Sequence, residues 1–130
     1  MEEPERWLVD GFNVLHVGIL SGRERGRWWG GEARTRLLTR IAGFDGEGEL
    51  CVVFDGPEPQ EPGAQAPNAR TRVVFAPSAD EWLLAEVRGS RAPGTLAVVT
   101  ADRKLADRAR HRGARVVSPR DFLARCPSSE

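Results

Sequence analysis

The stretch WLVDGFN, Trp7–Asn13, joins a short apolar run directly to a carboxylate, Asp10. An aspartate is among the side chains least often buried unless another group pairs with it, so its place at the end of a buried-looking strand needs a reason. The same arrangement returns in VVFDG (residues 52–56), in VVFAPSAD (73–80) and in LAVVTAD (96–102). Each is a β-branched apolar run followed by an aspartate, and four such repeats make chance a poor explanation.

Five short runs, rich in valine and bounded by Gly, Pro or Asp, predict β-strands. They lie at about residues 7–10, 49–55, 71–76, 95–101 and 114–118. Several are apolar throughout rather than alternating, which is typical of strands that are covered on both faces. Apolar residues at helical spacing predict helices over residues 32–43, 79–88 and 103–112, and Ser118-Pro119 predicts the start of a last short helix. The alternation of strands and helices predicts an α/β fold with a mostly parallel sheet, expected as a single domain over residues 1–130.

Capping and turn residues predict where these elements begin and end. In SADE, residues 78–81, the serine and glutamate have the spacing of a capping box, which places Asp80 in the first turn of a helix. We likewise expect Thr100 to cap a helix that carries Asp102 in its first turn. Two segments without a periodic pattern predict long surface loops, residues 18–31 and 56–68.

Composition argues against secreted and membrane proteins. The two cysteines, Cys51 and Cys126, provide neither a disulfide framework nor the spacing of a metal site. No apolar run approaches the roughly 20 residues of a membrane span, and the first residues lack the pattern of a signal peptide. We therefore expect a cytoplasmic protein without a membrane partner.

The formal net charge is zero, from 19 basic and 19 acidic residues, but the charges are unevenly distributed. Residues 21–40 carry six bases against two acids, residues 41–62 carry six acids and no base, and residues 101–125 carry eight bases against three acids. Two interpretations stay open at this point. The basic blocks could cover solvated helix faces, or they could attract a phosphate backbone.

The aspartates that follow the strands are expected to lie close together. The carboxyl ends of parallel strands share one edge of a sheet, where ligands bind, and four aspartates belong to it: Asp10, Asp55, Asp80 and Asp102. Carboxylates this close raise each other's pKa unless a cation neutralises them, and Mg²⁺ or Mn²⁺ prefers such oxygen ligands. Structural explanations also exist, because Asp80 and Asp102 suit a first helical turn and Asp55 suits an ordinary turn. Asp10 has none, and the adjacent Gly11 would let the backbone approach a ligand closely.

Five pieces of sequence, in this order, resemble the YacP-like NYN domains, which are relatives of the PIN nucleases. They are VDGFN (residues 9–13), VFD (53–55), SAD (78–80), TAD (100–102) and the GA pair (113–114) before Val116-Val117. The similarity spans about residues 6–124 and implies a PIN-like three-layer α/β/α fold and a metal-dependent endoribonuclease. The Arg-Trp-Trp content of residues 18–31 departs from the family's pattern and leaves the substrate contacts open.

The resemblance implies roles for individual residues. Asp10, Asp80 and Asp102 are the expected catalytic and metal-binding acids. Asn13 is expected to position Asp10 or a phosphate, and Asp55 matches an acidic position with a less defined supporting role. The implied cofactor is Mg²⁺ or Mn²⁺, and the implied partner is RNA, which we expect to be bound by Arg23, Arg25, Arg27, Arg103, Lys104 and Arg108. The sequence leaves open the oligomeric state and whether a larger ribonucleoprotein assembly delivers the RNA.

Two other functions compete with a nuclease. A non-catalytic RNA-binding or adaptor module would keep the fold and bind RNA without a metal ion. A phosphatase of the phospho-aspartate type needs a second aspartate two residues after the first, and that position holds Phe12, so we discount it. The presence of all three expected acids favours the enzyme over the adaptor.

Overall fold

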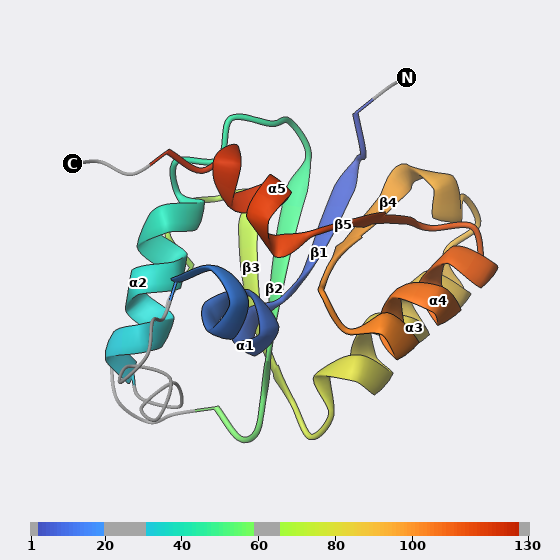
Figure 1. Ribbon diagram of the computed structural model, residues 1–130, viewed down its shortest axis with the longest axis horizontal. Coiled ribbons are helices and arrows are strands. Elements are labelled where there is room, and N and C mark those ends of the chain that lie inside the picture. Colours follow the sequence, from blue (N-terminus) through green and yellow to red (C-terminus); the bar gives the residue numbers. More distant parts are fainter. Residues whose placement is uncertain (1–2, 20–30, 59–65, 128–130) are drawn as a thin grey trace.

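A five-stranded parallel sheet forms the centre of the molecule, as a computed structural model of the chain shows for residues 3–19, 31–58 and 66–127 (Figure 1). The strand order is β3-β2-β1-β4-β5, and all four neighbouring pairs are parallel. The strands are β1 (Arg6–Asp10), β2 (Glu49–Asp55), β3 (Thr71–Ala76), β4 (Leu96–Val99) and β5 (Arg115–Val117). They fall within about a residue or two of the runs expected from the sequence, so the predicted α/β class is confirmed.

Helices cover both faces of this sheet and make three layers (Figure 1). One face carries α1 (Gly11–Val14), the π-helix η1 (Leu15–Ile19), α2 (Gly31–Ile41) and α5 (Pro119–Ala124). The other face carries α3 (Ala79–Gly89) and α4 (Arg103–His111), while a short 3-10 turn, η3 (Pro93–Thr95), precedes β4. Among the described residues, no helix has both the length and the apolar character that a membrane span requires.

Alternation along the strands decides which face each side chain joins. In β1, Trp7 and Val9 belong to the core beneath α1, α2 and α5, whereas Leu8 belongs to the core beneath α3 and α4. Both cores are apolar, so successive positions of an inner strand must all be apolar. This requirement explains why the runs in the sequence are continuous rather than alternating.

The order in which the chain adds strands to the sheet reverses between β1 and β4. The chain leaves β1 through α1, η1 and α2 to reach β2 on one side, whereas β4 on the other side of β1 is reached from β3 through α3. Open α/β sheets bind ligands at such a switch point, outside the carboxyl ends of the strands. The ends of β1 and β4 are therefore the first place to look for a site.

Two helical elements were not predicted from the sequence, and parts of the two expected loops are helical or fall outside the described residues. Of the loop expected over 18–31, Gly18 and Ile19 belong to the π-helix η1, Gly31 begins α2, and residues 20–30 lie outside the described part of the chain. The stretch GFNVLHVGI has no clear helical periodicity, so α1 and η1 were missed. Of the loop expected over 56–68, residues 56–58 and 66–68 are irregular as predicted, and residues 59–65 are not described.

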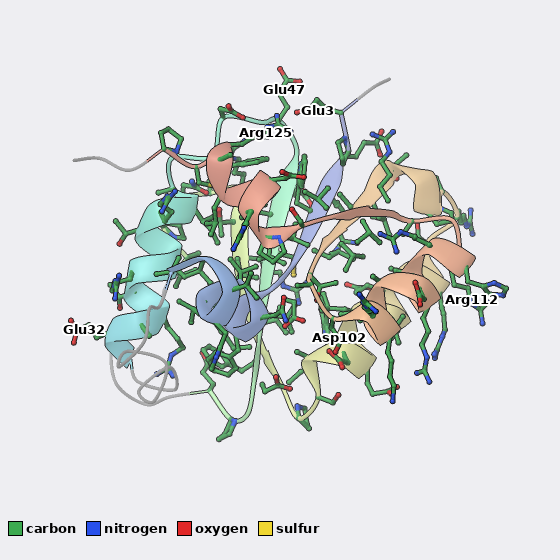
Figure 2. All side chains as sticks on the ribbon, viewed as in Figure 1. Glu3, Glu32, Glu47, Asp102, Arg112 and Arg125 are labelled. Atoms are coloured by element: carbon green, nitrogen blue, oxygen red, sulfur yellow. The ribbon has the colours of Figure 1, made fainter. Side chains whose placement is uncertain are left out.

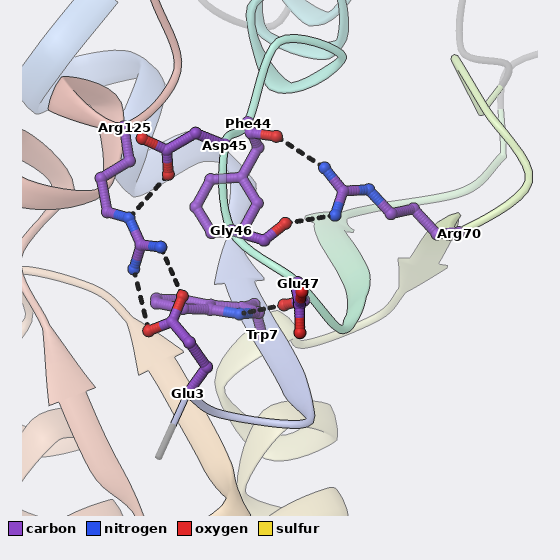
Figure 3. A network of polar contacts seen from close by, with 8 residues as sticks. All are labelled: Glu3, Trp7, Phe44, Asp45, Gly46, Glu47, Arg70 and Arg125. Atoms are coloured by element: carbon purple, nitrogen blue, oxygen red, sulfur yellow. Dashed lines mark hydrogen bonds and ion pairs between the residues drawn. The ribbon is translucent and has the colours of Figure 1, made fainter. Parts of the chain in front are cut away.

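The amino edge of the sheet is closed by a cation–aromatic cluster, which Figure 2 places on the molecule and Figure 3 enlarges. The guanidinium of Arg125 lies 5.3 Å from the ring centre of Trp7 and 5.1 Å from that of Phe44, and the two rings meet edge to face. Arg125 also pairs with Glu3 and, at 2.9 Å, with Asp45. These contacts join the N-terminal segment, the α2–β2 connection and the end of α5, at the opposite edge from the aspartates.

Gly11 is predicted to be essential for packing. A Cβ atom at this position would lie 2.5 Å from Cε1 of Phe54 and 2.9 Å from the backbone oxygen of Val53, so Gly11 lets the backbone of α1 approach β2 closely. We expect Gly11→Ala to lower the free energy of unfolding by about 1–3 kcal/mol, because the core must shift to admit the methyl group. Urea unfolding measures this change.

Gly89→Ala is the matched control. Nothing lies within 4 Å of a Cβ at Gly89, which ends α3, and alanine is the better helix former, so this variant should be as stable as the wild type or more so. Equal unfolding midpoints for Gly11→Ala and the wild type would contradict the packing account.

Candidate active site at the carboxyl edge of the sheet

Asp10 ends the central strand at the switch point and is almost completely buried, with 6% of its surface exposed. Alternation along β1 directs its side chain to the same face as Leu8, the face that α3 and α4 cover. Its Oδ2 accepts a hydrogen bond of 3.1 Å from the hydroxyl of Thr100, the residue that follows β4. This hydroxyl is the partner that a buried carboxylate requires, and the bond spans the gap between β1 and β4.

Thr100 connects Asp10 to Asp102. Besides donating to Asp10, the Thr100 hydroxyl accepts a hydrogen bond of 3.1 Å from the backbone N–H of Asp102. Asp102 is the N-cap of α4, because its Oδ1 accepts from the backbone N–H groups of Lys104 (2.9 Å) and Leu105 (3.3 Å). The prediction that Thr100 caps this helix was therefore wrong. The cap falls two residues later because the Asp102 carboxylate accepts from two N–H groups of the first turn, whereas the Thr100 hydroxyl accepts only from the N–H of Asp102, which precedes the helix.

Asn13 supports the turn between β4 and α4. Its side-chain Oδ1 accepts a hydrogen bond of 2.7 Å from the backbone N–H of Ala101, so α1 is tied directly to the turn that presents Asp102. The expected role of Asn13, to position Asp10 or a phosphate, stays a prediction. Asn13 holds the backbone beside the candidate acids.

Asp55 and Asp80 lie at the junction between the sheet and α3. Asp55 ends β2, and its Oδ1 accepts a hydrogen bond of 2.8 Å from the backbone N–H of Ala79, the first residue of α3. The Ser78 side chain caps the same helix by accepting from Glu81 N–H at 3.2 Å, which places Asp80 in the first turn as the sequence predicted. Asp55 therefore has a structural function that orients the helix carrying Asp80.

The aspartates act on one another electrostatically. Burial raises the pKa of Asp10 from its ordinary 3.8 to about 7; the Thr100 hydrogen bond opposes this shift, and the charges of Asp80 and Asp55 add to it. The pKa of Asp80 is also raised, first by burial and then by Asp102 and Asp55. The structure thus brings all four aspartates into one acidic cluster at the carboxyl edge, defined as Asp10, Asp55, Asp80 and Asp102.

The chemistry of this acidic cluster fits a divalent cation. Carboxylate oxygens are the preferred ligands of Mg²⁺ and Mn²⁺, and a cation would offset the burial and the mutual repulsion that together raise the pKa values of Asp10 and Asp80. As the side chains stand, no three Asp, Glu, His or Cys residues in the described part of the chain are close enough to hold one ion. A bound ion would therefore require some of these carboxylates to turn toward one another.

The basic residues expected to bind RNA are only partly described. Arg23, Arg25 and Arg27 lie outside the described residues. Arg103 and Lys104 are exposed at the start of α4, directly after Asp102. Arg108 lies one turn beyond Lys104, close enough to Asp80 to lower the pKa of that carboxyl.

Sequence reasoning missed the part that Thr100 plays in this site. The TAD motif at residues 100–102 drew attention to Thr100, but this residue was interpreted as a helix cap. Its bond to Asp10 joins residues 90 positions apart, so it depends on the pairing of β1 with β4.

Comparisons with known proteins match the chain to one family profile and to solved structures. A sequence profile described as the YacP-like NYN domain matches residues 7–130. A crystal structure of Rae1 (YacP) from Bacillus subtilis has a TM-score of 0.67 and 26% identity, covering 95% of this chain and 72% of that one. A mutant of the same Bacillus subtilis protein gives a TM-score of 0.68 and 23% identity, covering 92% of this chain and 73% of that one. No curated protein matches the chain.

The raised pKa of Asp10 predicts a pH-dependent stability in the absence of metal ions. Between pH 3.8 and about 7 the folded chain holds a proton on Asp10 that the unfolded chain has released, so the free energy of unfolding falls as pH rises through this window. Above pH 7 Asp10 is ionised in the folded chain as well, and burial of its charge then lowers the free energy of unfolding by up to about 4 kcal/mol. Asp10→Asn cannot ionise and should lose this slope, which urea unfolding in EDTA measures across the window.

Asp107→Asn is the control, because Asp107 is an exposed residue of α4 whose side chain is 78% accessible. It should keep the wild-type slope. Parallel stability curves for the wild type and Asp10→Asn would show that Asp10 does not titrate in this way.

Proposed function

Since the chain belongs to the family of YacP-like NYN domains, a nuclease-like fold related to RNA, we propose that it is a metal-dependent endoribonuclease. The observation that carries this proposal is the buried Asp10 at the switch point of the sheet, hydrogen-bonded by Thr100 and influenced electrostatically by Asp80 and Asp55. A protein keeps a carboxylate in so unfavourable a place at a cost in stability, and such perturbed groups concentrate at functional sites. Hydrolysis of an RNA phosphodiester is the reaction that the family and the acidic cluster support together.

Mg²⁺ or Mn²⁺ would be held by Asp10, Asp80 and Asp102. When bound, a divalent cation in such a site supplies positive charge that activates water and stabilises the leaving oxygen of a phosphodiester. The remaining residues hold these acids in place. Thr100 orients Asp10, Asn13 holds the turn before Asp102, and Asp55 anchors the start of the helix that carries Asp80.

RNA would be held mainly through its phosphates. The described basic residues nearest the acidic cluster are Arg103, Lys104 and Arg108 on α4, and Arg23, Arg25 and Arg27 belong to the other basic block. Contacts of arginine and lysine with phosphate position a nucleic acid without reading its bases. Binding should therefore weaken with salt and depend little on base sequence.

An RNA-binding adaptor without turnover is the second candidate function. It is favoured by the structural bonds that occupy two of the acids, because Asp55 accepts from Ala79 and Asp102 caps α4. An adaptor would bind RNA equally well with and without a divalent cation.

The proposal predicts cleavage of an end-labelled single-stranded RNA in Mg²⁺ or Mn²⁺ and none in EDTA, as resolved by denaturing gel electrophoresis. Asp102→Asn is the most informative variant, because asparagine caps a helix about as well as aspartate and so keeps α4 in place. We expect its cleavage rate to fall about 100-fold or more, which corresponds to a loss of nearly 3 kcal/mol of transition-state stabilisation.

Asp121→Asn removes an exposed carboxylate from α5, on the opposite face of the sheet, and should cleave at the wild-type rate. Cleavage that persists in EDTA or in Asp102→Asn would contradict the proposed metal site. RNA binding without cleavage in any metal would favour the adaptor.

A further inference from the structure

A groove of about 290 Å³ lies between α3 and α4. Its lining residues are Leu84 and Arg88 from α3 and Asp107, Arg108, His111 and Arg112 from α4. All of them except Leu84 are exposed. We call it the α3–α4 groove.

The α3–α4 groove carries an excess of positive charge. Within residues 3–19, 31–58 and 66–127, Arg88, Arg108 and Arg112 make no ion pair closer than 4 Å. The one carboxylate of the lining, Asp107, pairs at 3.5 Å with Arg110, which does not line the groove. Three arginines from two helices therefore line one groove with a single carboxylate among them, and this excess of positive charge attracts an anion.

Helix stability alone does not explain this arrangement. Arginines near the C-terminal ends of α3 and α4 interact favourably with the helix dipoles, which accounts for Arg88, Arg108 and Arg112 one at a time. The dipoles do not require the arginines of two helices to face the same groove. An anionic ligand would balance the excess of positive charge that this placement creates.

The groove leads away from the acidic cluster. Both α3 and α4 begin at the carboxyl edge, so Asp80 and Asp102 lie at one end of the helix pair and Arg88 and Arg112 lie eight and ten residues further along, about 12–15 Å. Figure 2 shows Asp102 and Arg112 at opposite ends of α4. Arg108 lies between them and interacts electrostatically with Asp80.

We infer that the α3–α4 groove binds the backbone of a single-stranded RNA on one side of the acidic cluster, an inference that rests on the proposed function. Arg88, Arg108 and Arg112 contact successive phosphates as the strand leaves the acids. The groove is small, about 290 Å³, and arginines line it from both helices, which suits contact with one phosphate backbone. The aliphatic stems of the arginines, Leu84 and the ring of His111 supply apolar and planar surface against which bases pack.

The test is equilibrium binding of a fluorescein-labelled oligouridine of roughly 12 nucleotides, measured by fluorescence anisotropy in EDTA so that no cleavage occurs. The double variant Arg88→Ala/Arg112→Ala should bind about 10-fold or more weakly at 0.1 M salt, on the order of the electrostatic contribution of two phosphate contacts. Losing these contacts should also reduce the slope of log K against log salt by about 1.4. Thermal unfolding checks that the variant remains folded, as expected for exposed side chains.

The control, Arg72→Ala/Arg120→Ala, removes the same charge from exposed positions outside the groove, one on β3 and one on α5 at the opposite face of the sheet. It should keep the wild-type slope and bind within about 2-fold of the wild type, since it removes no groove contact. Equal losses in the two double variants would overturn the inference, because binding would then follow net charge alone. Displacement of the RNA by polyglutamate at equal charge concentration would also overturn it and would indicate an acidic polypeptide as the ligand.

A parallel cleavage assay in Mg²⁺ separates this inference from the proposed function. Metal-dependent cleavage together with unaltered binding by Arg88→Ala/Arg112→Ala would overturn the groove and leave the nuclease. Groove-dependent binding without cleavage by the wild type would support the groove and overturn the nuclease.

Discussion

The hydrogen bond between Thr100 and Asp10 is the interaction on which the candidate site depends. It joins the ends of β1 and β4, between which the strand order reverses, and it supplies a partner for a carboxylate that is only 6% exposed. The same hydroxyl accepts from the backbone of Asp102, so one side chain fixes the relative positions of two of the acids. The raised pKa of Asp10 shows that this partner offsets only part of the cost of burial.

Two of the four aspartates hold helices in place at the candidate site. Asp55 accepts from the first residue of α3, and Asp102 accepts from the first turn of α4, so each of these acids holds a helix against the end of a strand. The helices then carry Asp80 and Arg108 to positions where they influence each other. These capping bonds fix the backbone beside the acids, whereas binding of a metal ion would require some of the carboxylates to turn toward one another.

Much of the fold could be predicted from the sequence, because burial on both faces makes inner parallel strands continuously apolar and easy to recognise. The gathering of Asp10, Asp55, Asp80 and Asp102 followed from the rule that parallel strands end at one edge. The role of Thr100 could not be predicted, because its partner is distant in the sequence and a threonine two residues before an aspartate is equally typical of a helix cap. The α3–α4 groove was missed for a related reason. Arg88 and Arg112 come from different helices and meet only because α3 and α4 pack side by side.

The most direct test of the central claim is a crystal structure of the chain soaked with Mn²⁺, with anomalous diffraction collected near the manganese absorption edge. The account predicts an anomalous peak at the carboxyl edge of the sheet, within coordination distance of the carboxylate of Asp10 and of at least one other member of the acidic cluster. Full-occupancy manganese elsewhere with none beside Asp10, or no bound manganese at all, would contradict it.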